Sequence, residues 1–369
     1  MTAQCRTRSA VYAITFAALG SLLCVAGLGC GKTGQREVAA LPRLEPSPRA
    51  VQGGTAPQYA FSIAPGLLAD SSRSIPSELT VYSVVRQKLT RDVMCELAEK
   101  VGVSVAPEFR ASMPDTVEEP YRRVGLIGEL TSDIMAKESN VGPEDKYVAY
   151  VAKQVGGITG ENLVVLNMTA MDDGNYTLGL RGSDPEPGGE APTEEEARAI
   201  AERFVERNGL LPEGCELGGV STSASVPAAE SGLGDVPEKA VGSQVVYQRY
   251  VNGYPGGQFV VQVNGKGEIY YVYRNARNVT PLGSYPILTP EEAVEALSEG
   301  RGSITGPTRP GAPLEATVEK IKLCYDQGAA AIPFETLQPS YWIEGSVDGY
   351  TDGFHALIPA VRPEYLEAE

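Results

Sequence analysis

The hydrophobic pattern predicts an antiparallel meander in the middle of the chain. Val245–Val251, Gln258–Val263 and Glu268–Arg274 are short runs rich in Val, Tyr and Phe. Turn-forming stretches separate them, at Asn252–Gly257 and Asn264–Gly267. Strand-forming residues bounded by Asn-Gly and Gly-Gly pairs are typical of hairpins. We therefore predict three consecutive strands, around which the rest of the fold is built.

Helices are predicted where apolar residues recur every three or four positions. One spans Thr90–Val101. A second begins after Thr193, which forms a capping-box sequence with Glu196, and a third begins after Thr289. We expect the last two helices to cover one face of the meander, using Ile200, Phe204, Val294 and Leu297.

Shorter apolar or alternating runs predict further strands toward both ends of the chain. They are Tyr59–Ala64, Glu78–Val85, a hairpin of Asn162–Met168 and Asn175–Leu180, and a closing set of Val318–Tyr325, Pro339–Glu344 and Gly353–Val361. Arg122–Leu130 and Tyr147–Val155 are compatible with strand or helix, and Leu217–Ala240 is expected to be a loose insertion. The pattern as a whole predicts an α+β fold, with antiparallel sheets and helices packed on one face.

The first 30 residues have the features of an export signal. Arg6 and Arg8 form a basic start, and Ala10–Gly29 is an uncharged, mostly apolar run, about long enough to span a bilayer. It ends in Ala26-Gly-Leu-Gly-Cys30, which resembles the lipobox of bacterial lipoproteins with Gly27 where leucine is usual. This predicts lipidation of Cys30 and an extracytoplasmic, membrane-anchored protein. An uncleaved anchor or a plain secretory signal is the alternative.

Composition divides the remainder of the chain. Residues 31–58 carry four prolines and little periodicity, which predicts a flexible tether after the signal peptide at 1–30. Residues 182–192 are rich in Pro, Gly and acidic residues, which predicts a boundary. It would separate an N-terminal α+β region, 59–182, from a C-terminal α+β domain, 193–366.

The charge balance excludes some classes of partner. The 369-residue chain has a formal net charge of −16, which becomes −18 without Arg6 and Arg8, the charged residues of the leader. Such a chain would repel phosphate, so it is a poor binder of nucleic acid or of an anionic membrane surface. An apolar content of 42% predicts a packed core.

Candidate catalytic motifs lack the context that their chemistry needs. Ala26–Thr33 fits a permissive phosphate-loop pattern, but the export signal precedes it and the tether follows it. His355 is the only histidine and lies in an expected strand among core-like residues, which favours a structural role. We predict no catalytic residue, no metal ligand and no cofactor.

Acidic turns and cysteines complete the search for metal or redox chemistry. Asp172–Gly174 and Asp348–Gly353 suggest calcium at first, but Tyr350 and Pro359 stand where calcium ligands are needed, and turn chemistry explains both stretches. Three cysteines are scattered singly in the body, without a zinc-binding spacing. One disulfide among them and three isolated thiols are both compatible with the sequence; the residues are Cys95, Cys215 and Cys324.

The density of tyrosines in the meander is unusual. Alternation places Tyr271 and Tyr273 on one face of the sheet and Tyr270 on the other. Tyrosine packs well between strands, so a core role is one interpretation. The other is a recognition surface, because tyrosine offers a rigid apolar body with a polar tip. We predict ligand binding by Tyr250, Tyr254, Tyr271 and Tyr273.

Several of these segments resemble known families. Tyr247–Pro255 followed by Val260–Glu268 is similar to the strand–turn–strand of PepSY-type and thermolysin-propeptide-type domains. Ile287–Ala293, Leu337–Gly345 and Phe354–Val361 resemble the YycH/YycI-type regulatory proteins. The resemblance covers under half of the chain. It implies a PepSY/YycI-like C-terminal region and, by analogy, an extracytoplasmic α+β protein that binds and restrains a membrane sensor kinase.

These observations together favour a binding protein. The leading hypothesis is a non-enzymatic envelope lipoprotein that binds another extracytoplasmic protein or a peptide, held at the membrane through lipid on Cys30. A protease propeptide or inhibitor-like module is one alternative. A carboxylate-based enzyme is the other, which a deep pocket with two perturbed carboxylates would support.

Overall fold

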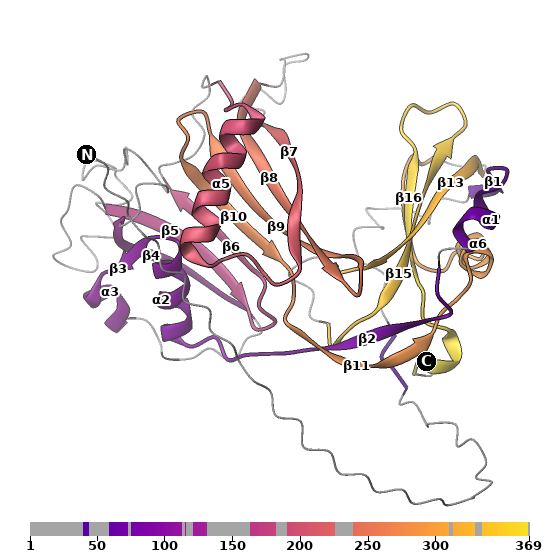
Figure 1. Ribbon diagram of the computed structural model, residues 1–369, viewed down its shortest axis with the longest axis horizontal. Coiled ribbons are helices and arrows are strands. Elements are labelled where there is room, and N and C mark those ends of the chain that lie inside the picture. The colour runs from indigo at the N-terminus through magenta and orange to yellow at the C-terminus, as the bar shows by residue number, and fades with distance from the viewer. Residues whose placement is uncertain are drawn as a thin grey trace, which may run out of the picture. The chain divides into compact units, whose positions relative to one another are not determined.

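Three β-sheets and a few helices form the part of the chain that the structure describes (Figure 1). This computed structural model describes residues 40–43, 59–72, 75–112, 115, 121–130, 163–181, 190–225, 239–309, 313–328 and 334–367. The helices are α1 (Leu67–Ser72), α2 (Arg91–Lys100), α3 (Pro107–Ser112), α5 (Glu194–Asn208), α6 (Pro290–Ser298) and the 3-10 helix η2 (Pro363–Tyr365). The mixed α+β class with mainly antiparallel sheets is confirmed.

The largest sheet has eight strands in the order β3-β4-β5-β6-β10-β9-β8-β7. Every neighbouring pair in it is antiparallel. The strands are β3 (Val103–Val105), β4 (Tyr121–Leu130), β5 (Leu163–Met171), β6 (Tyr176–Arg181), β7 (Cys215–Ser225), β8 (Lys239–Val251), β9 (Tyr254–Asn264) and β10 (Ile269–Asn275). The predicted β8–β9–β10 meander and the β5–β6 hairpin are both confirmed.

The turn between β8 and β9 is shorter than predicted. Asn252 and Gly253 both have positive φ angles, 51° and 80°. Two such residues form the tight turn that matches the twist of a hairpin, so β9 begins at Tyr254 rather than at Gln258. The Gly-Gly pair at 256–257 lies inside β9, where the register with β8 shifts.

Helices α2 and α5 share one face of the eight-stranded sheet (Figure 1). Met94 and Ala98 of α2 and Phe204 of α5 are fully buried in one core with Phe259 and Val272 of the sheet. Both predicted helix starts are correct: Thr90 and Thr193 are N-caps, and Thr193 forms the complete capping box with Glu196. Hydrogen bonds from Thr193 to the Glu196 carboxylate lower the pKa of that carboxyl group.

A second sheet has five strands in the order β1-β13-β15-β16-β12. Its strands are β1 (Tyr59–Ile63), β12 (Ser303–Thr305), β13 (Leu314–Tyr325), β15 (Pro339–Val347) and β16 (Phe354–Pro359). β1 pairs with β13 in parallel, and the other neighbours are antiparallel. The alternation predicted for the last strand is confirmed, because Phe354, Ala356 and Ile358 are buried whereas His355 is exposed.

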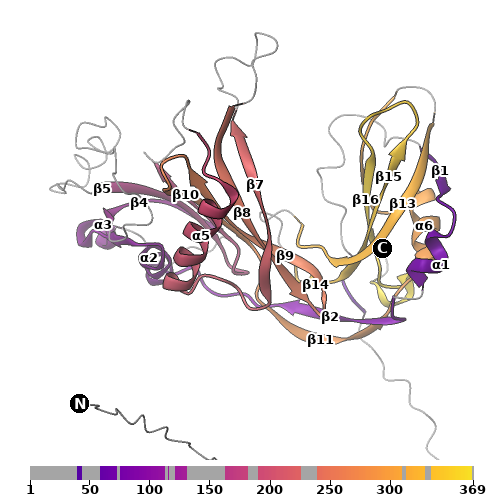
Figure 2. The ribbon, with the colours of Figure 1, turned by 45° about the horizontal axis from the view of Figure 1, so that its top comes forward.

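The expected position of α6 was wrong. Its capping box at Thr289 is present as expected, but Val294 and Leu297 are buried with Ile343 and Ala356 of the five-stranded sheet. Figures 1 and 2 both place α6 and α1 beside β13. The cause is the connection before the helix: β11 (Val279–Pro286) leaves the meander and pairs with β2 (Glu78–Val84). Chain proximity therefore did not predict which core α6 covers.

The predicted boundary at 182–192 does not separate the sheets. β6 pairs with β10, and β1 pairs with β13, so strands from both sides of the boundary share two sheets. A third sheet, β11-β2-β14, with β14 at Thr336–Leu337, also combines early and late strands. All these strands lie in one compact unit, Val38–Glu369.

Two stretches without apolar periodicity form strands. Leu217–Ala240 was expected to be a loose insertion, but its first part belongs to β7, which pairs with β8 along its length. The Gly/Pro-rich stretch 300–313, for which the sequence pattern predicts a loop, contains β12. Backbone pairing at a sheet edge does not need a hydrophobic pattern, which explains both errors. The leader, the tether to residue 58 apart from 40–43, and the segment 147–155 lie outside the described residues.

Candidate functional site

The structure places the four predicted tyrosines in different surroundings. Tyr271 and Tyr273 are half-buried, and both point to the face of β10 opposite Val272, which is buried under α5. Tyr250 lies near the end of β8 and is 41% exposed. Tyr254 packs partly against Tyr325 and against the core of the five-stranded sheet. Tyr271 and Tyr273 therefore belong to one surface, whereas Tyr254 is mainly a packing residue.

Glutamines surround the tyrosine pair on the same sheet face. Tyr271 lies opposite Gln262 of β9, which lies opposite Gln244 of β8. Gln262 Nε2 donates to Gln244 Oε1 at 3.2 Å. Gln258 is on this face too, because it alternates with Gln262 along β9. We call Tyr271, Tyr273, Gln244, Gln258 and Gln262 the tyrosine–glutamine surface; sequence reasoning found its tyrosines and missed its amides.

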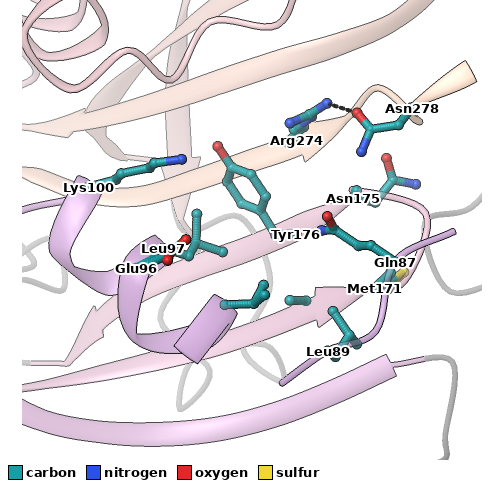
Figure 3. Close-up of a pocket in the computed structure, with 13 residues that line it drawn as sticks. Gln87, Leu89, Glu96, Leu97, Lys100, Met171, Asn175, Tyr176, Arg274 and Asn278 are labelled. Carbon is teal, nitrogen blue, oxygen red and sulfur yellow. Dashed lines mark hydrogen bonds between the residues drawn. The ribbon is translucent and has the colours of Figure 1, made fainter. Parts of the chain in front are cut away.

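A pocket of about 240 Å³ lies on the other, helix-covered face of the same sheet (Figure 3). It lies where α2 meets the β5–β6 hairpin and the end of β10. Its lining combines one apolar wall with one polar wall. The apolar wall has Leu89, Val93, Leu97, Ala170 and Met171, and the polar wall has Gln87, Glu96, Lys100, Asn175, Tyr176, Arg274 and Asn278, with Gly174 between strands.

Three polar groups of this pocket lie near one another. Figure 3 shows the hydroxyl of Tyr176 between the ends of Lys100 and Arg274, with Leu97 beside Tyr176 and Leu89 farther from these groups. Arg274 is held in place by two hydrogen bonds, from Nε to the Ala276 carbonyl at 3.1 Å and from Nη2 to Asn278 Oδ1 at 2.8 Å. The pocket thus presents a fixed guanidinium above an apolar wall.

Burial perturbs both central groups of the polar wall. Desolvation lowers the pKa of Arg274, although the nearby Tyr176 opposes that shift. Burial raises the pKa of Tyr176 to about 12, and Arg274 lowers it in part. At neutral pH the tyrosine is therefore a hydroxyl donor and the arginine a cation. Within the described residues, Arg274 makes no ion pair with a carboxylate.

A second guanidinium, that of Arg249, lies near the first. Burial lowers the pKa of Arg249, and the charge of Arg274 lowers it further. Arg249 Nη1 donates to the Arg277 carbonyl at 2.6 Å. Its Nε is buried and has no hydrogen-bond partner among the described residues. Two neighbouring cations therefore lie partly buried without a direct ion pair to a described carboxylate, although Asp173 acts on Arg274 and Glu213 on Arg249 at longer range. Sequence patterns did not single out Lys100, Arg249 or Arg274.

The acidic turn at 172–174 has a structural role, as turn chemistry predicted. Asp173 is 3% exposed in its side chain and pairs with Arg277, which is 0% exposed, at 2.6 Å. Asp172 pairs with Arg86 at 2.7 Å near the surface. Gly174 has a φ of 92°, which favours glycine. Asp173 thus holds the β5–β6 turn against the segment after β10, and Asp172 holds it against the segment after β2.

The other sequence candidates have ordinary surroundings. His355 is exposed and stacks on Trp342, with ring centroids 4.9 Å apart. Cys95, Cys215 and Cys324 are free thiols. Of the two interpretations, a disulfide or three isolated thiols, the structure therefore supports the isolated thiols. Burial raises the pKa of Cys324 to about 12. Among the residues that the structure describes, no group of three or more His, Cys, Asp or Glu could hold a metal ion.

The predicted membrane anchor lies outside the described residues. Cys30 and the apolar run before it fall outside the described residues. In the ranges that are described, no helix has the length and apolar character needed to cross a membrane.

Comparisons with known proteins give no family. No family model matches the chain, and no curated protein matches it. Among solved structures, it is similar to an uncharacterized protein from Eubacterium rectale ATCC 33656, with 10% identity and a TM-score of 0.34, over 79% of this chain and 87% of that one. A TM-score this low does not define a shared fold, and neither a family nor a function follows from the match.

Proposed function

We propose that this protein is a non-enzymatic envelope lipoprotein that binds another extracytoplasmic protein or a peptide. The observation that carries the proposal is the tyrosine–glutamine surface, which lies on the sheet face opposite α2 and α5. Tyrosine and amide side chains supply contact area and adaptable hydrogen bonds at low entropic cost. The resemblance to PepSY-type and YycI-type extracytoplasmic domains belongs to the same proposal.

The chemistry of this surface suits a protein partner. Its side chains are uncharged within a chain of net charge −16, so an approaching acidic or basic protein meets no local repulsion there. Interface cores are typically depleted in charge and enriched in tyrosine. A nucleic acid would instead need a basic groove to neutralise its phosphates.

Photo-crosslinking tests the binding surface. We expect a photoreactive phenylalanine analogue at position 271 or 273 to give one discrete, reproducible adduct in cells. Tyr350 is the matched control, because it is 41% exposed but lies in the β15–β16 turn. Tyr271→Ala and Tyr273→Ala should abolish the adduct formed from the other position, because each removes part of a shared contact.

Stability measurements separate recognition from core packing. Because Tyr271 and Tyr273 are half-buried, their alanine variants should lose less than the roughly 3–5 kcal/mol typical of large core aromatics. Tyr247→Ala, 4% exposed under α5, provides the core reference. Equal losses for all three variants, or equal crosslinking at position 350, would contradict the proposed surface.

The lipoprotein part of the proposal has its own test. We expect the mature protein to begin at Cys30 with a lipidated N-terminus, because a basic start, an apolar run and small residues precede that cysteine. Mass spectrometry of the N-terminal peptide measures this directly. A Cys30→Ser variant should remain unprocessed; if its cleavage and membrane retention are unchanged, Cys30 is not the lipidation site.

A further inference from the structure

We propose that the pocket between α2, the β5–β6 hairpin and β10 binds the carboxylate of a small organic acid or peptide C-terminus that carries an apolar group. Arg274 and Lys100 would hold the carboxylate, and the wall of Leu89, Val93 and Leu97 would hold the apolar group. Arg274 lies on the face of β10 opposite Tyr271 and Tyr273, so this site is independent of the tyrosine–glutamine surface.

Uncompensated positive charge is the first argument for an anion. Arg274 and Arg249 are partly buried neighbours, and neither makes an ion pair with a described carboxylate. Asp173 acts on Arg274, and Glu213 on Arg249, only at longer range, and Asp173 is already paired with Arg277 at 2.6 Å. Buried charges are normally paired. Arg274 lines the pocket without an ion pair to a described carboxylate, which indicates that a negative group completes the site.

The geometry of the polar wall is the second argument. A guanidinium is a planar fork that matches the two oxygens of a carboxylate. Two nitrogens of Arg274 are fixed by Ala276 and Asn278, which leaves Nη1 for a ligand. Figure 3 shows the Tyr176 hydroxyl and the Lys100 amine on the same side of the pocket. These groups offer several donors to one anion.

The apolar wall distinguishes an organic acid from a bare phosphate. Leu89, Val93 and Leu97 line the same cavity as the cations, and inorganic phosphate would gain nothing from these apolar side chains. A volume of about 240 Å³ is below the range of drug-sized pockets, roughly 300–1,000 Å³, and suits a ligand the size of one acylated amino acid. Glu96 is the opposing charge in the lining. It is exposed at the rim, so solvent screens its repulsion of an anion.

Calorimetric titration of the purified full-length protein provides the test. The probe is N-acetyl-leucine, which combines a carboxylate, an amide and an apolar side chain. N-acetyl-leucine amide is the matched probe without the charge, and inorganic phosphate is the probe without the apolar group. We expect N-acetyl-leucine to bind about tenfold or more tightly than either of the other probes. The amide loses the charge-assisted hydrogen bond, and phosphate loses the apolar contact.

Two variants place the ligand at this pocket. Arg274→Gln should weaken N-acetyl-leucine binding about tenfold or more. Lys100→Gln, at an exposed position, should weaken it about twofold to fivefold without affecting folding. Lys322→Gln, an exposed cation on the five-stranded sheet, is the control and should leave binding unchanged.

The outcomes separate the proposal from its rivals. If Arg274→Gln does not fold, the Lys100→Gln result and the comparison of the three probes still decide. Equal binding of N-acetyl-leucine and its amide, tighter binding of phosphate, or an absence of saturable binding by N-acetyl-leucine would each overturn the proposal. Crosslinking from positions 271 and 273 tests the other face of the sheet. The pocket hypothesis and the hypothesis of the tyrosine–glutamine surface can therefore be rejected independently.

Discussion

Replacing Asp173 by asparagine should cost about 3–5 kcal/mol of the free energy of unfolding, because it removes the direct ion-pair partner of a buried arginine. The side chains of Asp173 and Arg277 are 3% and 0% exposed, and Arg277 Nε lies 2.6 Å from Asp173 Oδ2. Asparagine has nearly the same volume as aspartate, so the change removes the charge and little packing. Urea unfolding followed by circular dichroism measures the loss.

The neighbouring residue is a matched control. Asp172 lies in the same turn and pairs with Arg86 at 2.7 Å, but its side chain and that of Arg86 are 21% and 35% exposed. Pairs near the surface contribute about 0–1 kcal/mol, so Asp172→Asn should cost about 1 kcal/mol or less. The two variants change the formal charge equally. A similar loss of stability for both would show that burial of the Asp173–Arg277 pair does not matter.

Arg277 explains why the effect should spread beyond the turn. Besides Asp173, its guanidinium contacts the carbonyl oxygen of Gln327, and it lies over the Phe334 ring at 4.7 Å. The Gln327 amide in turn donates to the Gly256 carbonyl of β9 at 2.6 Å. One buried cation thus connects the β5–β6 turn, the end of β10 and the segment after β13. We expect the double variant Asp173→Asn, Arg277→Met to lose less than the sum of its single variants, since both remove the same interaction.

Local patterns were enough to predict most of the elements. The Thr193–Glu196 capping box, the apolar stripe ending in Phe204 and Val205, and a turn beginning at Asn252 depend on residues close in sequence. Each is found in the structure, although the turn is shorter than the predicted Asn252–Gly257. Partners distant in the chain could not be predicted in this way. The parallel pairing of β1 with β13 joins residues such as Tyr59 and Leu314, and no local pattern encodes that contact.

The candidate sites show the same limit. Alternation predicted that Tyr271 and Tyr273 share a face, because the period of a strand is a local property. The pocket needs Lys100 from α2, Tyr176 from β6 and Arg274 from β10, which come together through the pairing of β6 with β10. An arginine at the end of a tyrosine-rich strand is unremarkable in sequence. Only the folded chain shows that this arginine makes no ion pair with a described carboxylate.

Replacing Gly345 by alanine should destabilise the five-stranded sheet by about 1–3 kcal/mol or more, as expected for overpacking of a tight site. A Cβ atom at this position would overlap with the Thr317 carbonyl oxygen of β13, and it would lie 2.6 Å from Cε1 of Phe354. The first obstacle is backbone, which a change of side-chain rotamer cannot relieve. Gly345 pairs with Val318 next to a register shift in β13, so the strands there approach closely because the residue has no side chain.

Gly219 of β7 is the matched control for this glycine. It also lies in a strand beside a register shift, but a Cβ atom there would have no heavy atom within 4 Å. Gly219→Ala should therefore change stability by about 0.5 kcal/mol or less, or increase it, because alanine restricts the unfolded chain. Thermal and urea unfolding of the two variants measure the difference. If Gly345→Ala is as stable as Gly219→Ala, β13 and β15 can separate without cost, and the close approach at Thr317 is not a constraint on this sheet.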